Sequence, residues 1–381
     1  MHAQYTAAEL SYIGAVGKRP ETLIRSGNHS KISRSLEKGG VVVITGASAG
    51  VGRATAHAFA KAGAKVALIA RDAAALERTK AEVESFGTSA AIFPPDVADA
   101  GAVFDAAMRC EAELGPIDVW VNNAMTTVFS PVADLTPEEV RRVTEVTYLG
   151  YVHGTMAALR HMQRRDHGVI VQVGSALAYR GIPLQSAYCG AKHAIRGFTD
   201  SLRAELVHSE SGIRLTTVHL PAVNTPQFDW ARTHRTKLPR PVAPVYTPET
   251  AARAILNAAR HPEREYWLGG TSLLTILANM LFPGLLDRHL ARDAVDGQDR
   301  PEDVPTDRPD NLFSPVSEAH RTDGSFSDEV RAGALRLAAP RARMGMAFGL
   351  CLVAGAAGAM LGAALASGGD RRAHSGQRRD R

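Results

Sequence analysis

Cysteine is scarce in this sequence, and its three copies lie far apart. Cys110, Cys189 and Cys351 are the only cysteines among 381 residues, and no two have the CxxC spacing of a zinc ribbon. This scarcity argues against a disulfide-stapled fold and fits a reducing compartment. With 34 glycines and 20 prolines, the chain is also unlike a fibrous or wholly disordered protein. We expect a globular protein without a metal site.

The chain also lacks, near its N-terminus, the long apolar run of a secretory signal, so export is not expected. Residues 1–38 show no sustained apolar period. We interpret them as a flexible N-terminal extension with one short helix at 7–16. The catalytic part of the chain is expected in the cytoplasm.

A basic stripe interleaved with aromatic residues is missing from the central region, although the net charge is +5. The net charge is +3 over 1–38, −7 over 287–330, +4 over 331–369 and +3 over 370–381, which leaves +2 on 39–286. The basic character therefore belongs to the ends of the chain. We expect no nucleic-acid partner.

From residue 41 onward, short β-branched runs alternate with Ala-rich helical stretches. The predicted strands are 41–45, 65–70, 90–93, 119–122, 169–173, 214–220 and 266–268. The predicted helices are 52–62, 73–86, 100–114, 137–164 and 187–209. This alternation predicts an α/β fold of the Rossmann type, with a doubly wound parallel sheet in a single catalytic domain over 39–286.

The first predicted strand runs into a glycine-rich turn. Gly46, Gly50 and Gly52 let the backbone approach a pyrophosphate, and the helix that follows presents free N–H groups to it. Ser48 and Val51 lie within the same turn. Its place after the first strand of a βαβ series predicts a dinucleotide site rather than a simple tight turn.

Four further motifs follow in order. They are Asp-Val-Trp-Val-Asn-Asn-Ala at 118–124, Ser175 thirteen residues before a tyrosine, Tyr188-xxx-Lys192, and Pro-Ala-Val-Asn-Thr at 221–225. Together with the glycine turn they resemble the short-chain dehydrogenase/reductase family over about 40–270. The extensions at both ends lie outside the resemblance.

Tyr188 and Lys192 are four residues apart on a predicted helix and therefore share a face. An ammonium beside a phenol favours the phenolate, which predicts a Tyr188 pKa below the usual value of about 10 and a proton donor and acceptor near neutral pH. The resemblance implies that Ser175 binds the substrate carbonyl and that Lys192 also holds the nicotinamide ribose.

The cofactor is expected to be NADP, with NAD as the alternative. Arg71 follows the second strand, where its guanidinium would pair with a 2′-phosphate, although Asp72 comes directly after it. The resemblance implies adenine contacts from Asp96 and Val97. It further assigns cofactor contacts to residues near the nicotinamide: Asn123, Pro221 and Thr225.

Three positions depart from the family pattern. Met125 and Ala222 stand where glycine is usual, and Thr147 stands where the family carries an asparagine that holds a water in the proton relay. A threonine hydroxyl can bind a water but has no amide carbonyl. We therefore expect Thr147 in the catalytic set, with retained but slower chemistry.

Residues 344–369 contain no charged side chain, and Arg341, Arg343, Arg371 and Arg372 flank them. We predict a transmembrane or membrane-contacting helix over 343–369, with a soluble Ala/Gly-rich helix as the alternative. An acidic, Pro-rich and partly disordered linker over 287–342 precedes it, and an Arg-rich tail, 370–381, follows. A second uncharged stretch, 266–286, is interpreted as a pocket lid, with a membrane span as the alternative.

The hypothesis is an NADP(H)-dependent oxidoreductase that interconverts a carbonyl and a secondary alcohol on a small hydrophobic substrate and forms homo-oligomers. One alternative is a nucleotide-binding sensor or scaffold without turnover, which the Thr147 substitution motivates. The other is a membrane-assembly protein.

Overall fold

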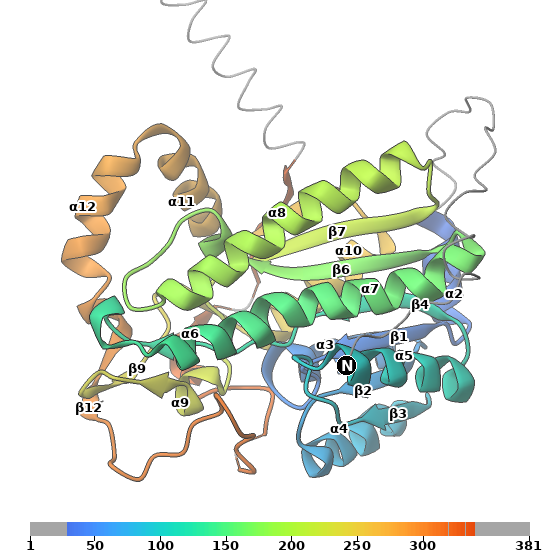
Figure 1. Ribbon diagram of the computed structural model, residues 1–381, viewed down its shortest axis with the longest axis horizontal. Helices are drawn as coiled ribbons and strands as arrows, with labels where there is room; N and C mark the ends of the chain where they lie inside the picture. The colour runs from blue at the N-terminus through green and yellow to red at the C-terminus, as the bar shows by residue number, and fades with distance from the viewer. Residues whose placement is uncertain (1–28, 319, 332, 340–381) are drawn as a thin grey trace, which may run out of the picture.

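The computed structural model describes residues 29–318, 320–331 and 333–339. Within them, an eight-stranded sheet lies between two layers of helices (Figure 1). Its strand order is β14-β11-β7-β6-β4-β1-β2-β3. This arrangement confirms the predicted α/β fold of the Rossmann type.

Seven parallel strands and one antiparallel edge strand make up this sheet. The parallel strands are β1 (Val41–Thr45), β2 (Lys65–Ile69), β3 (Ala90–Phe93), β4 (Ile117–Asn122), β6 (Gly168–Ser175), β7 (Ile213–Leu220) and β11 (Glu265–Leu268). The antiparallel strand is β14 (Arg336–Ala338). Most residues of the central strands are buried, which explains their runs of valine and isoleucine.

Two sets of helices cover the two faces of the sheet. One face packs against α2 (His29–Glu37), α3 (Gly50–Lys61), α4 (Ala73–Ser85) and α10 (Pro248–Arg260). The other face packs against α5 (Ala100–Leu114), α7 (Gly150–Met162) and α8 (Ser186–His208). The helices α7 and α8 lie in front of the sheet in Figure 1.

The predicted helix over 137–164 is interrupted. It consists of α6 (Pro137–Thr144), a π-helical turn (Glu145–Leu149) and α7. A π-helical turn is rare and often marks a functional position, and this one contains Thr147.

The sequence analysis missed α10, although its start carries a clear signal. The Thr247 side chain caps the helix by accepting from the Thr250 N–H, and Pro248 occupies the first turn. Its alanine-rich face packs on α3. This packing covers the sheet on the side opposite α7 and α8.

Beyond β11 the chain forms two helices that project at one end of the sheet (Figure 1). They are α11 (Gly270–Leu281) and α12 (Pro283–Asp293), and Phe282 separates them. Among the described residues, no helix combines the length and apolarity needed to cross a membrane. The described residues 266–286 therefore do not form the membrane-spanning helix that was considered as an alternative.

The segment expected as a linker has definite structure where it is described. Its first residues belong to α12, and it continues into β12 (Asp299–Asp303), which pairs with β9 (Lys237–Pro239). Later it adds β13 (Val330–Arg331) beside β10 (Val245–Tyr246) and β14 to the main sheet. Backbone pairing with distant strands thus replaces the expected partial disorder.

Several expectations fall outside the described residues. They concern the short helix at 7–16, the apolar segment 343–369 and the Arg-rich tail 370–381. Part of the N-terminal extension is described, however, because α2 packs Ile32 and Leu36 into the core on the α3 side.

Candidate active site

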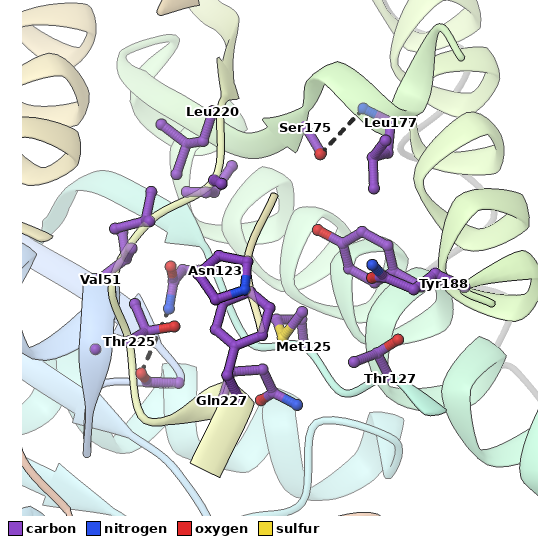
Figure 2. A pocket seen from close by; sticks show the side chains of 18 of the residues that line it. Val51, Asn123, Met125, Thr127, Ser175, Leu177, Tyr188, Leu220, Thr225 and Gln227 are labelled. Carbon is purple, nitrogen blue, oxygen red and sulfur yellow. Dashed lines mark hydrogen bonds between the residues drawn. The ribbon is translucent and has the colours of Figure 1, made fainter. Parts of the chain in front are cut away.

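A cavity of about 440 Å³ opens at the carboxyl ends of the parallel strands. Ligands bind at this edge in open α/β sheets. Figure 2 shows Ser175 and Tyr188 on one side of it and Val51, Asn123 and Thr225 on the other. The cavity is lined by most of the predicted site residues: Gly46, Ser48, Gly50, Val51, Arg71, Asp96, Val97, Asn123, Ser175, Tyr188, Lys192, Pro221 and Thr225.

The glycine turn is built so tightly that side chains do not fit. Gly46 has φ +70, and a Cβ on Gly52 would lie 2.0 Å from the Gly46 carbonyl oxygen. These positions require glycine because the backbone folds back on itself before α3 begins. The turn is therefore a cradle for a group that approaches the backbone closely, as a pyrophosphate does.

Asn123 braces this cradle rather than pointing freely into the cavity. Its Nδ2 donates to the Thr45 carbonyl oxygen at 3.0 Å, and its backbone N–H donates to Thr45 Oγ1 at 2.9 Å. These bonds tie the end of β4 to the end of β1. Asn123 thus supports the edge of the sheet beside the glycine turn through contacts within the chain.

Arg71 lies at the nucleotide end of the cavity, where its guanidinium already has partners. It donates to the carbonyl oxygens of Asn311, Leu312 and Phe313 at 2.6, 3.4 and 3.1 Å. Burial lowers the pKa of Arg71, and the nearby Asp96 carboxylate opposes this shift. These carbonyl partners could not be predicted from the sequence, because they lie about 240 residues further along the chain.

Asp96 is fixed by Arg142 of α6, with which it forms an ion pair, and by the Ala98 N–H at 3.0 Å. Val97 is buried beside it and packs on Gly150. Both residues line the cavity next to Arg71. Arg71, Asp96 and Val97, for which adenosine contacts were predicted, thus lie together on the cavity wall.

Ser175 and Tyr188 lie on the same side of the cavity (Figure 2). The Ser175 Oγ accepts from the Leu177 N–H at 3.1 Å. Burial raises the pKa of the Tyr188 phenol, and the Ser175 hydroxyl opposes that shift. The expected lowering by Lys192 is therefore not found in the protein alone.

The physical reason lies in the burial of Lys192 itself. Its Nζ is 5.6 Å from the centre of the Tyr188 ring, and burial lowers the pKa of the ammonium to about 7. A lysine near its own pKa carries only part of a charge at neutral pH. Its Nζ donates to the Tyr151 hydroxyl at 3.0 Å and to the Val173 carbonyl oxygen at 2.8 Å.

Thr147, predicted in the catalytic set, bonds within the chain and does not line the cavity. Its hydroxyl donates to the Thr126 carbonyl oxygen at 2.9 Å and accepts from the Thr126 N–H at 3.0 Å. The side chain is fully buried and is absent from the cavity wall. These two bonds make Thr147 a brace for the segment after β4.

Tyr151 is the residue that the sequence analysis missed at this point. It lies one helical turn after Thr147, and its hydroxyl donates to Val173 O at 2.9 Å while accepting from Lys192. A tyrosine in an apolar helix gives no sequence signal of this role, because the partners come from β6 and α8.

Two comparisons with known sequences agree with this geometry. A family model described as short chain dehydrogenase matches residues 40–236. An uncharacterized oxidoreductase of Bacillus subtilis is 36% identical over 261 residues, which cover 68% of this chain and 73% of the relative. A fatty acyl-CoA reductase of Acinetobacter baylyi is 32% identical over 234 residues, or 61% of this chain and 77% of the relative.

A solved structure is also similar. It is an alcohol dehydrogenase from Thermococcus sibiricus complexed with 5-hydroxy-NADP. The match has a TM-score of 0.52 and 27% sequence identity, and it covers 60% of this chain and 95% of the other.

Proposed function

Because this chain belongs to the short-chain dehydrogenase family and is an oxidoreductase of CH–OH groups, we propose that it interconverts a carbonyl and a secondary alcohol on a hydrophobic substrate with NADP(H). The observation that carries the proposal is the convergence of Ser175, Tyr188 and Lys192 on one cavity with the glycine cradle. The alternative, a nucleotide-binding sensor without turnover, is tested by a substrate screen.

Each residue of the set has a distinct task in carbonyl reduction. NADPH, when bound, supplies the hydride that the carbonyl carbon receives. Tyr188 donates its phenolic proton to the carbonyl oxygen, and Ser175 donates a hydrogen bond to that oxygen as negative charge develops on it. Lys192 stabilises the resulting phenolate. In alcohol oxidation the phenolate takes the hydroxyl proton.

The preference for NADP over NAD rests on Arg71. Its planar guanidinium has five N–H donors, and three of them bond to carbonyl oxygens of the chain. The remaining donors are available to a phosphate. Arg142 adds a second positive charge nearby, and the Asp96 carboxylate offsets part of the positive charge of the two arginines. A 2′-phosphate would meet the remaining Arg71 donors here, although the Asp72 carboxylate also lines this part of the cavity.

The wall of the substrate half supports an apolar substrate. It is lined by Met125, Leu177, Ile182, Phe228, Val242 and Leu290. One relative is named a fatty acyl-CoA reductase, which makes long-chain aldehydes and acyl thioesters natural members of a test panel. Buried apolar surface contributes about 0.8 kcal/mol per methylene, so the apparent affinity should rise with chain length.

The test is a screen of ketones, aldehydes and acyl-CoA thioesters of increasing length, followed by NADPH absorbance. We expect turnover of long-chain carbonyls and poor turnover of short ones. Binding of NADPH without turnover of any member of the panel would favour the sensor and sink the enzyme proposal.

We also propose membrane contact for a catalytic domain that faces the cytoplasm. Support comes from the uncharged stretch 344–369 and from apolar side chains exposed on α11, α12 and the residue between them, namely Leu274, Met280, Leu281, Phe282 and Leu285. Ending the chain after Ala339 keeps β14 in the sheet while removing this stretch. Loss of liposome sedimentation with full activity would support a tethered enzyme, and full-length protein that never sediments would refute the contact.

A homo-oligomer is the remaining part of the proposal. Val140 of α6 and Met156 of α7 are large apolar side chains exposed on the same side of the sheet. Light scattering should give a mass above that of one chain, and Met156→Glu should lower it. A monomeric mass for the wild type would exclude the oligomer.

A further inference from the structure

The chain between β12 and β13 forms a strap across the nucleotide end of the cavity. We define the strap as residues 305–318 and 320–329. It runs from the β9–β12 corner back toward the start of α3 (Figure 1). Four of its residues line the same cavity as the glycine turn, namely Asn311, Pro315, Val316 and His320.

Arg308 fixes the strap at its root. Its guanidinium donates to the carbonyl oxygens of Phe228, Asp229 and Ala231 at 3.2, 3.1 and 2.6 Å. These three carbonyls belong to α9 (Gln227–Trp230) and the residue after it. Arg308 itself is not part of the cavity wall, so its removal loosens the strap without deleting a lining side chain.

The strap is then fastened to the nucleotide-binding residues themselves. Arg71 holds three successive strap carbonyls, as described above. The Gly50 N–H donates to the Arg321 carbonyl oxygen at 2.9 Å, and Arg53 Nη1 donates to the His320 carbonyl oxygen at 2.5 Å. The strap therefore contacts both the glycine turn and the end of β2.

Among the described residues, two buried polar atoms without a partner belong to strap residues that line the cavity. Asn311 Oδ1 and His320 Nδ1 have no hydrogen-bond partner within the part of the chain that the structure describes. His320 Nε2 faces the Val316 carbonyl oxygen at 2.6 Å and Asp72 Oδ2 at 3.2 Å, which assigns the ring proton to Nε2. Burial lowers the pKa of His320, so the ring is neutral and Nδ1 is an acceptor.

Two acceptors at this end of the cavity match what an adenosine offers. In NADP(H) the 3′-hydroxyl of the adenosine ribose and the adenine amino group are donors, whereas the 2′-phosphate needs the donors of Arg71. A buried acceptor without a partner is costly, and a bound donor recovers that cost.

We propose that the strap is the outer wall of the cofactor site, that Asn311 and His320 accept hydrogen bonds from the adenosine half of NADP(H), and that the strap must open before the cofactor leaves. This inference rests on the proposed function, because it takes NADP(H) as the ligand. It makes binding of the nucleotide depend on residues far beyond the segment that matches the family model.

The first test measures NADPH affinity by fluorescence titration, without turnover. His320→Ala and Asn311→Ala should each weaken binding about 10-fold, the loss of one buried hydrogen bond. His289→Ala, which removes an exposed histidine of α12, is the matched control and should bind like the wild type. Unchanged affinity in both strap variants would overturn the proposal.

The second test measures the rate of NADPH release by stopped-flow displacement. Arg308→Ala should speed release about 10-fold, whereas the control Arg264→Ala, which removes a half-exposed ion pair with Asp200, should not. Slower release or tighter binding in Arg308→Ala would mean that the strap competes with the cofactor, which contradicts the proposal.

Hydrogen exchange on the wild type keeps the proposal testable if a variant fails to fold. Strap amides should gain protection from exchange when NADPH is added. Loss of protection would show that NADPH displaces the strap and would overturn the strap proposal.

The strap proposal and the enzyme proposal can also fail separately. If the wild type turns over carbonyls but the strap variants bind NADPH normally, only the strap proposal falls. If the wild type binds NADPH with a protected strap but turns over nothing, only the enzyme proposal falls.

Discussion

The ammonium nitrogen of Lys192 lies 3.0 Å from the hydroxyl oxygen of Tyr151, and both groups donate to the carbonyl oxygen of Val173. This triangle is completely buried and holds the ammonium beside the Tyr188 ring. Tyr151 stands one turn beyond Thr147, whose own hydroxyl is used elsewhere. A tyrosine hydroxyl is thus the side-chain group that positions Lys192, the lysine proposed for catalysis.

Removing that hydroxyl should move the pH dependence of the reaction. The Tyr151 oxygen accepts from the charged ammonium, so Tyr151→Phe disfavours that charge and lowers the pKa of Lys192 below about 7. With less positive charge beside it, the Tyr188 phenolate forms at higher pH. The rising limb of alcohol oxidation should shift upward by about one pH unit, since a hydrogen bond to a charged group contributes about 1.5–3 kcal/mol.

Tyr148→Phe is the matched control, since it removes a hydroxyl from the preceding π-helical turn without touching Lys192. Its profile should coincide with that of the wild type. If Tyr151→Phe is slower but its pH profile matches that of the wild type, Tyr151 contributes only packing and does not position Lys192.

Lys192 should destabilise the fold near neutral pH. Its pKa is about 7 when folded and 10.5 when exposed. Between these values the unfolded chain binds a proton that the folded chain lacks, so stability rises with pH across this window. Lys192→Met should therefore raise the melting temperature most at pH 7 and below. The gain should shrink toward pH 10.5.

Thermal melts of Lys192→Met across this pH range check the prediction. Lys61→Met, an exposed lysine of α3, is the control and should follow the wild type at every pH. A Lys192→Met protein that melts below the wild type at pH 7 would contradict the destabilising role.

Arg71 should affect the two cofactors unequally. Arg71→Ala removes donors for a 2′-phosphate and also releases three strap carbonyls. NADPH affinity should fall at least about 10-fold more than NADH affinity, because only NADPH carries the phosphate. A smaller loss for NADH is expected from the loosened strap. Parallel fluorescence titrations with both cofactors measure the difference, and equal losses would refute the phosphate role.

The sequence allowed the sheet and the catalytic motifs to be predicted because both are local patterns. A β-branched run followed by Gly46 and Gly52 identifies a strand and a cradle without knowledge of neighbours. The spacing of Tyr188 and Lys192 likewise places them on one helix face. These predictions needed only the period of a helix and the steric needs of glycine.

The strap and the role of Thr147 could not be predicted in this way. The contact between Arg71 and Asn311 joins residues 240 positions apart, and an acidic, Pro-rich stretch has the composition of a linker whether or not it binds elsewhere. Thr147 and Tyr151 are both polar residues near one turn, and only the placement of Thr126 and Val173 decides which of them reaches Lys192.

The most direct test of the central claim compares the wild type with Tyr188→Phe on one accepted long-chain carbonyl. NADPH oxidation is followed under single-turnover conditions, and NADPH binding is titrated in parallel. The variant should lose at least about 100-fold in rate, the usual contribution of a positioned general acid, while its NADPH affinity stays near that of the wild type. An undiminished rate in Tyr188→Phe would contradict the account.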